Sequence, residues 1–76
     1  MSGFSMKSMA ANLRAHRART RLSQRQVAQF IGCSTGALQK WEAGECVPAV
    51  DSAYSLAELY GVTVDSLCCE PNRPAA

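Results

Sequence analysis

Two short helical stretches that lie almost end to end constrain this chain more than any other feature. Ser23 is followed three residues later by Gln26, the reciprocal pattern that caps a helix start, and the stretch ends at Gly32, which suits a left-handed helix end. Ser34 follows almost at once and can cap a second stretch, which ends at Gly44. Two short helices joined this closely predict a helix-turn-helix unit.

Further helical stretches flank this unit on both sides. Residues 8–19 contain no Gly or Pro and are rich in Ala, Leu and Arg, which favour helix. Pro48 precedes another helical stretch, Ala49 to Tyr60, which ends at Gly61. Thr63 can cap one last short turn. The fold class we expect is therefore all-α, with five helices in one compact unit.

The chain is too short for more than one domain. Of its 76 residues, we expect 9–67 to form the domain, between a flexible N-terminal segment, 1–8, and a flexible tail, 68–76. One histidine and six scattered acids do not suggest catalysis in so small a core, so we expect no enzyme, no cofactor and no metal site. There is no apolar run that would span a membrane and no signal-peptide block, which favours a cytoplasmic protein.

The four cysteines, Cys33, Cys46, Cys68 and Cys69, do not have the paired C-x-x-C spacing of zinc sites. Because Cys68 and Cys69 are adjacent, they are poorly placed to bridge. We expect reduced thiols, with a disulfide scaffold as the alternative.

Positive and negative charges are unevenly distributed along the chain. Residues 1–44 contain seven lysines and arginines and one acid, whereas residues 45–76 contain one arginine and five acids. A basic half beside an acidic half suggests a polyanionic partner that approaches from one side. A solvated charged helix would give the same pattern.

The second helix of the central unit, residues 34–43, has two different faces when it is placed on a helical wheel. One face is apolar apart from a glutamate, and the other is polar or small and carries no acid. A helix that enters the major groove of DNA needs hydrogen-bonding side chains toward the bases and no carboxylates toward the phosphates. The polar face meets these conditions, although an ordinary solvent-exposed face would meet them too. The polar face consists of Thr35, Gly36, Gln39, Lys40 and Ala43, and the other of Ala37, Leu38, Trp41 and Glu42.

Several short motifs together are typical of one protein family. They are Leu22-Ser23-Gln24, the small residue Ala28, Trp41-Glu42-Ala43-Gly44 and the run from Gly61 to Leu67. In this order and spacing they resemble the lambda-repressor-like helix-turn-helix family, the Cro and CI type also called the XRE family, over about residues 9–67. The resemblance implies a sequence-specific DNA-binding regulator of transcription, a repressor, whose helix 34–43 enters the major groove. The implied partner is double-stranded DNA with a palindromic operator, bound by a homodimer.

The resemblance also implies roles for particular positions. The base-reading positions are Thr35, Gly36, Gln39 and Lys40. Phosphates would be held by Gln24, Ser34 and the basic side chains Arg14 and Arg25. A second copy would be contacted through the last two helices, with Leu59, Tyr60, Val62 and Val64 as candidates.

Arg17 and Glu42 match an arginine and a glutamate that commonly pair between the first and third helices of the family. On the wheel, Arg17 flanks an apolar stripe and Glu42 lies at the inner edge of its helix. We therefore expect a partly buried ion pair with a structural role. The rival interpretation is that Arg17 contacts a phosphate directly.

Some positions depart from the family pattern. Gly36 has no side chain where relatives often carry a base-reading residue, and Thr35 is short. Gln39 and Lys40 would therefore do most of the long-range reading, and specificity would be modest or would rely on groove shape. His16 takes a position that is usually aliphatic, so we expect a core or half-buried histidine.

A second function remains open on the same fold. The chain would then be an antitoxin or adaptor whose main partner is another protein. Phe30 stands where a polar residue is usual, and the sequence leaves open whether it packs inside or is exposed.

Overall fold

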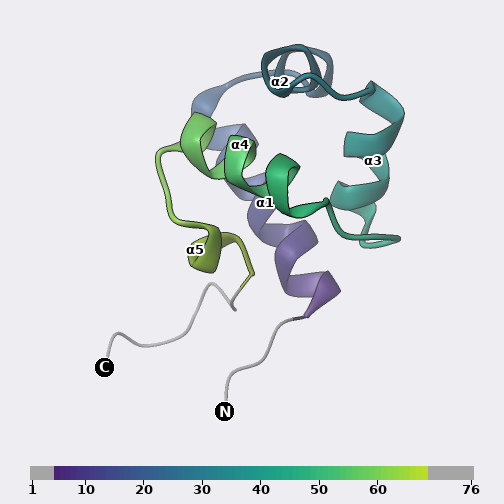
Figure 1. Ribbon diagram of the computed structural model, residues 1–76, viewed down its shortest axis with the longest axis vertical. Coiled ribbons are helices and arrows are strands. Elements are labelled where there is room, and N and C mark those ends of the chain that lie inside the picture. Colours follow the sequence, from purple (N-terminus) through teal and green to yellow (C-terminus); the bar gives the residue numbers. More distant parts are fainter. Residues whose placement is uncertain (1–4, 69–76) are drawn as a thin grey trace.

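The computed structural model describes residues 5–68, and over this range the chain is entirely helical (Figure 1). Five helices follow one another without a strand between them in the described range, as predicted. They are α1 (Met6–Thr20), α2 (Gln24–Ile31), α3 (Thr35–Ala43), α4 (Val50–Tyr60) and α5 (Val64–Cys68).

Side-chain caps define the helix starts of the central unit. Ser23 and Gln26 form the complete capping box at the start of α2, where the Ser23 hydroxyl accepts from the Gln26 backbone N–H and the Gln26 side chain accepts from the Ser23 backbone N–H. Ser34 Oγ accepts from the backbone N–H of Ala37 at 3.0 Å and so caps α3. Both caps were predicted from the sequence, and both use otherwise unpaired N–H groups of the first helical turn.

The helices at the two ends of the domain extend further than predicted. α1 begins at Met6 instead of residue 8, because Ser5 is its N-cap and accepts from the backbone N–H of Ser8 at 3.3 Å. Residues 6–8 are therefore part of the first helix and not of an N-terminal segment. At the other end, Cys68 is the last residue of α5 and not the first of the tail, whose residues 69–76 lie outside the described range.

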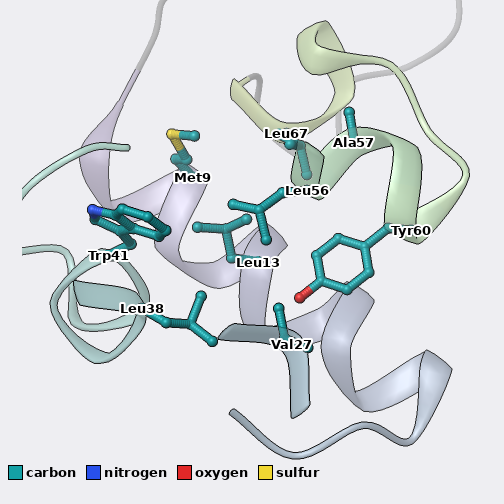
Figure 2. Close-up of a cluster of buried hydrophobic side chains, with 9 residues drawn as sticks. All are labelled: Met9, Leu13, Val27, Leu38, Trp41, Leu56, Ala57, Tyr60 and Leu67. Atoms are coloured by element: carbon teal, nitrogen blue, oxygen red, sulfur yellow. The ribbon is translucent and has the colours of Figure 1, made fainter. Parts of the chain in front are cut away.

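The helices are arranged around α1, which runs through the centre of the molecule (Figure 1). It contacts α3, α4 and α5, while α2 packs against α3 and α4. The apolar core lies where these helices meet, and every helix contributes to it (Figure 2). Burial of one large apolar side chain is worth about 1.5–3 kcal/mol, so this core holds all five helices together. Its largest fully buried members are Leu13, Leu38, Leu56, Leu67 and Val27.

Asn12 fixes the short helix α5 to α1. Its side chain is 4% exposed, and its Nδ2 donates to the carbonyl oxygens of Ser66 at 3.2 Å and Leu67 at 2.9 Å. These carbonyls at the end of α5 have no partner within a helix of that length. The buried amide therefore anchors the last helix, a role that the sequence pattern did not indicate.

None of the helices in the described part of the chain is both long and apolar enough to cross a lipid bilayer.

Candidate nucleic-acid interface

The outward face of α3 is open to solvent and carries no carboxylate. Gly36, Gln39 and Lys40 are exposed, and Thr35 is half-buried at the start of the helix. The only acid of α3, Glu42, is 3% exposed and belongs to the opposite face, together with the buried Leu38 and Trp41. The division of α3 into two faces is thus confirmed. The structure brings the four predicted base-reading positions together on one accessible surface.

A tight turn between α2 and α3 sets the direction in which this face points. The backbone N–H groups of Gly32 and Cys33 both donate to the carbonyl of Ala28 at 2.9 Å. Gly32 has a positive φ of 77°, a conformation that side chains disfavour. The chain leaves α2 in this left-handed conformation, and Ser34 opens α3 two residues later. Such a turn leaves little freedom between the two helices.

The carboxylate of Glu42 is the centre of a buried polar network. Its Oε2 accepts from Arg17 Nε at 2.8 Å, and its Oε1 accepts from Arg17 Nη2 at 3.1 Å, so the arginine binds both oxygens. Oε1 also accepts from Gln24 Nε2 at 2.9 Å. Three elements therefore meet at one carboxylate: α1 through Arg17, α2 through Gln24 and α3 through Glu42 itself.

Further bonds from α1 complete this network. Arg17 Nη1 donates to the carbonyl of Leu22 at 3.2 Å, in the turn between α1 and α2. Arg14 Nη1 donates to the backbone carbonyl of Glu42, close to the end of α3. The hydrogen bonds to Glu42 raise the pKa of Arg17 above its usual range. The arginine therefore stays charged, and the carboxylate keeps its counterion.

Two of the predicted phosphate-binding residues take part in this network. One amide hydrogen of Gln24 is directed to Glu42, which fixes the side chain at the first residue of α2. Arg14 is exposed but is tied to the backbone of α3. Of the other two, Arg25 is exposed on α2, and Ser34 uses its hydroxyl as a cap. Phosphate binding by these four residues stays a prediction.

His16 lies beside Tyr60, at the edge of the core. Its ring is half-buried, as expected, and stacks on Tyr60 with 5.7 Å between the ring centroids. Nδ1 lies 2.6 Å from Arg19 Nη2, and it must accept here because a guanidinium only donates. Burial, and then the charge of Arg19, lower the pKa of His16 below its ordinary value.

One of the four dimer candidates is a core residue. Tyr60 is 7% exposed and points into the apolar cluster (Figure 2), so it is not available to a second copy. Burial, and then the charge of Glu42, raise the pKa of Tyr60 to about 12. The prediction that Tyr60 contacts a second copy is therefore wrong, because position 60 of α4 faces α1 and not solvent. Leu59, Val62 and Val64 are half-buried and pack at the edge of the core.

Phe30 proves to be exposed. Its exposed fraction is 68%, and on α4 the exposed fractions of Tyr54 and Val50 are 63% and 76%. A shallow hollow of about 300 Å³ lies between α2 and α4, lined by Phe30, Ile31, Ser55, Glu58 and Leu59. Phe30, whose position the sequence left open, thus lines this hollow between α2 and α4.

The described cysteines do not gather at one place. Cys33 is half-buried against the core, and burial raises the pKa of its thiol. Cys46 is exposed in the loop between α3 and α4, and Cys68 packs against the core at the end of α5. No disulfide joins any two of these three residues, while Cys69 lies outside the described range.

Comparison with known proteins identifies this arrangement. A family model described as a helix-turn-helix domain matches residues 8–67. The P22 c2 repressor, solved in complex with a synthetic operator, superposes with a TM-score of 0.77 at 25% identity, covering 79% of this chain and 91% of the repressor. Comparison with curated proteins gave no match.

Two other solved structures share the fold. The SOS-response transcriptional repressor LexA from Eubacterium rectale gives a TM-score of 0.88 at 19% identity, covering 95% of this chain and 77% of that one. The restriction-modification controller protein C.AhdI from Aeromonas hydrophila gives 0.75 at 21% identity, covering 82% and 94%. The five helices of this chain therefore form the lambda-repressor-like fold.

Removal of Arg17 from the network should destabilise the domain. We expect Arg17→Met to lower the free energy of unfolding by about 3 kcal/mol, the lower end of the cost of stranding a buried charge, because Arg17 is itself 25% exposed. Urea unfolding of the variant and of the wild type gives the difference. Lys7→Met, which removes an exposed cation of the same helix, is the control. An Arg17→Met protein of wild-type stability that no longer binds DNA would show that Arg17 acts at a phosphate instead.

The lowered pKa of His16 makes stability depend on pH. The unfolded chain binds a proton near pH 6.5, whereas the folded chain binds it only at lower pH, so the free energy of unfolding falls as the pH drops below about 6.5. We expect this loss between pH 7.5 and pH 5.5 to be smaller in His16→Gln. Urea unfolding at the two pH values measures it. An equal loss of unfolding free energy in both proteins would show that His16 is not the group responsible.

Proposed function

The chain belongs to the helix-turn-helix domain family, and from this premise we propose that it is a sequence-specific DNA-binding regulator of transcription that acts as a repressor. Its fold is that of DNA-binding transcription regulators. The observation that carries the proposal is the outward face of α3, which is accessible, free of carboxylates and held in place by the Glu42 network.

Sequence would be read by the side chains of this face. Gln39 and Lys40 are exposed and long enough to reach base edges in the major groove, which is wide enough to admit a helix. An amide can pair with adenine through two bonds, and a lysine donates to guanine. Thr35 lies one turn before Gln39 and would contact the groove over a shorter reach.

The surrounding residues would hold the DNA backbone. Gln24 is oriented by Glu42, which uses one hydrogen of its amide and leaves the other available for a phosphate. Ser34 at the start of α3 and Arg25 at the start of α2 would contribute further contacts, as would Arg14 of α1. Contacts of this kind fix the register of a protein on the duplex, while base contacts give the sequence preference.

A homodimer on a palindromic operator fits a domain with one reading helix. Two-fold symmetry would place half-sites about 10 base pairs apart. Leu59, Val62 and Val64 are the remaining candidates for the contact between copies, since they pack at the edge of the core in α4, in the turn after it and in α5. Support for repression comes from the P22 c2 repressor, which was solved in complex with a synthetic operator.

Exposed apolar side chains support a second candidate function. Phe30 on α2, and Val50 and Tyr54 on α4, are large apolar side chains that are exposed to solvent. Large exposed apolar groups commonly mark contacts with other proteins. An antitoxin or adaptor would use such a surface as its main interface.

Selection of bound duplexes from a random DNA pool would separate the two functions, and a variant of α3 then tests the reading face. For the selected duplex, we expect Gln39→Ala to weaken binding by about 1–3 kcal/mol and to relax the preference at one base pair. Gln29→Ala, at an exposed glutamine of α2, should bind as the wild type does. Fluorescence anisotropy measures both affinities.

The salt dependence of the same affinities provides the second arm. If a dimer neutralises about six phosphates, the logarithm of the association constant should fall with the logarithm of salt concentration with a slope of about −5. Binding that ignores both sequence and salt would contradict a DNA-reading function and favour the protein-interaction module.

A further inference from the structure

Gly36 occupies a helix position that the fold does not require to be glycine. It is the second residue of α3, and its φ is not in the left-handed region, unlike that of Gly32, Gly44 and Gly61. Glycine in a helix is less favourable than alanine by up to about 1 kcal/mol. A glycine here therefore lowers helix stability without serving the backbone conformation.

Packing inside the protein does not require this glycine either. A Cβ placed on Gly36 would have no neighbouring atom within 4 Å, so the space above it is open. Gly44 shows the contrast, because a Cβ there would lie 3.7 Å from Ala10 Cβ and 3.8 Å from the carbonyl oxygen of Met6. The constraint that glycine satisfies at position 36 is thus to be sought outside the chain.

The surroundings of Gly36 indicate what approaches from outside. It is exposed on the same face as Gln39 and Lys40, in the first turn of the helix, which is the end that reaches base edges in proteins of this architecture. Without a Cβ, the backbone can come closer to a ligand than at any other residue type. In the major groove, the bulkiest apolar feature of a base pair is the 5-methyl group of thymine.

We infer that Gly36 is a specificity-determining position, where the absent side chain makes room for the 5-methyl group of a thymine. The inference rests on the proposed function, since it assumes that α3 enters the major groove. It adds a base to the preferred sequence that Gln39 and Lys40 do not read. Discrimination at this base pair comes from shape and apolar contact, and no side-chain hydrogen bond contributes to it.

The test pairs a protein methyl group with a DNA methyl group. Gly36→Ala adds a Cβ to the protein, and replacement of one thymine by uracil in the selected duplex removes the 5-methyl group while leaving its hydrogen-bonding groups unchanged. Each thymine of the half-site is replaced in turn, and the affinities of wild type and variant are measured by fluorescence anisotropy. Thermal unfolding of the variant shows that it is folded.

We expect Gly36→Ala to melt a few degrees above the wild type and to bind the thymine-containing duplex at least about fivefold more weakly, the smallest effect usual for one mismatched base pair. At one thymine, uracil should restore binding by the variant while weakening binding by the wild type. Uracil at the other thymines should affect both proteins equally and serves as the control.

Three results would overturn the inference. A melting temperature of the variant below that of the wild type would show that the fold itself needs glycine. Equal binding of the thymine duplex by both proteins would show that no clearance is used. Weaker binding by the variant that no uracil restores would exclude a thymine methyl as the neighbour. A wild type without any preferred duplex would instead refute the proposed function, and the inference with it.

Discussion

The buried carboxylate of Glu42 is the interaction on which the rest of the structure depends. A carboxylate with 3% exposure loses its hydration, a cost of several kcal/mol unless charged and hydrogen-bonding partners replace the water. Arg17 supplies two bonds and Gln24 a third, and the two residues come from α1 and α2. The geometry that satisfies this one group therefore fixes α3 relative to both preceding helices.

The orientation of α3 separates its core residues from the residues proposed to read DNA. Leu38 and Trp41 join the core, while Gln39 and Lys40 remain in solvent with freedom to bind. The same network extends to Gln24, which is held at the first residue of α2. A residue proposed for phosphate binding and the helix proposed for base reading are thus positioned by one carboxylate, and loss of this group would disturb both.

Local features of the structure were predictable from the sequence. The caps at Ser23 and Ser34 depend on residues three positions apart, so the pattern alone indicates them. Long-range contacts were harder to predict from the sequence. Nothing near Asn12 in the sequence indicates that its amide binds Ser66 and Leu67, because the partners are brought together only by the fold. The pairing of Arg17 with Glu42 was expected from the family resemblance and the wheel together, whereas the third partner, Gln24, was not.

Perturbation of backbone amide resonances on addition of DNA tests the central claim most directly. The duplex used is the one selected from the random pool, and the spectra of the full chain are recorded with increasing amounts of it. The account predicts that the largest shifts fall on residues 34–40 and on Gln24, at the starts of α3 and α2. Shifts that concentrate on Phe30, Val50 and Tyr54, with residues 34–40 unchanged, would contradict it.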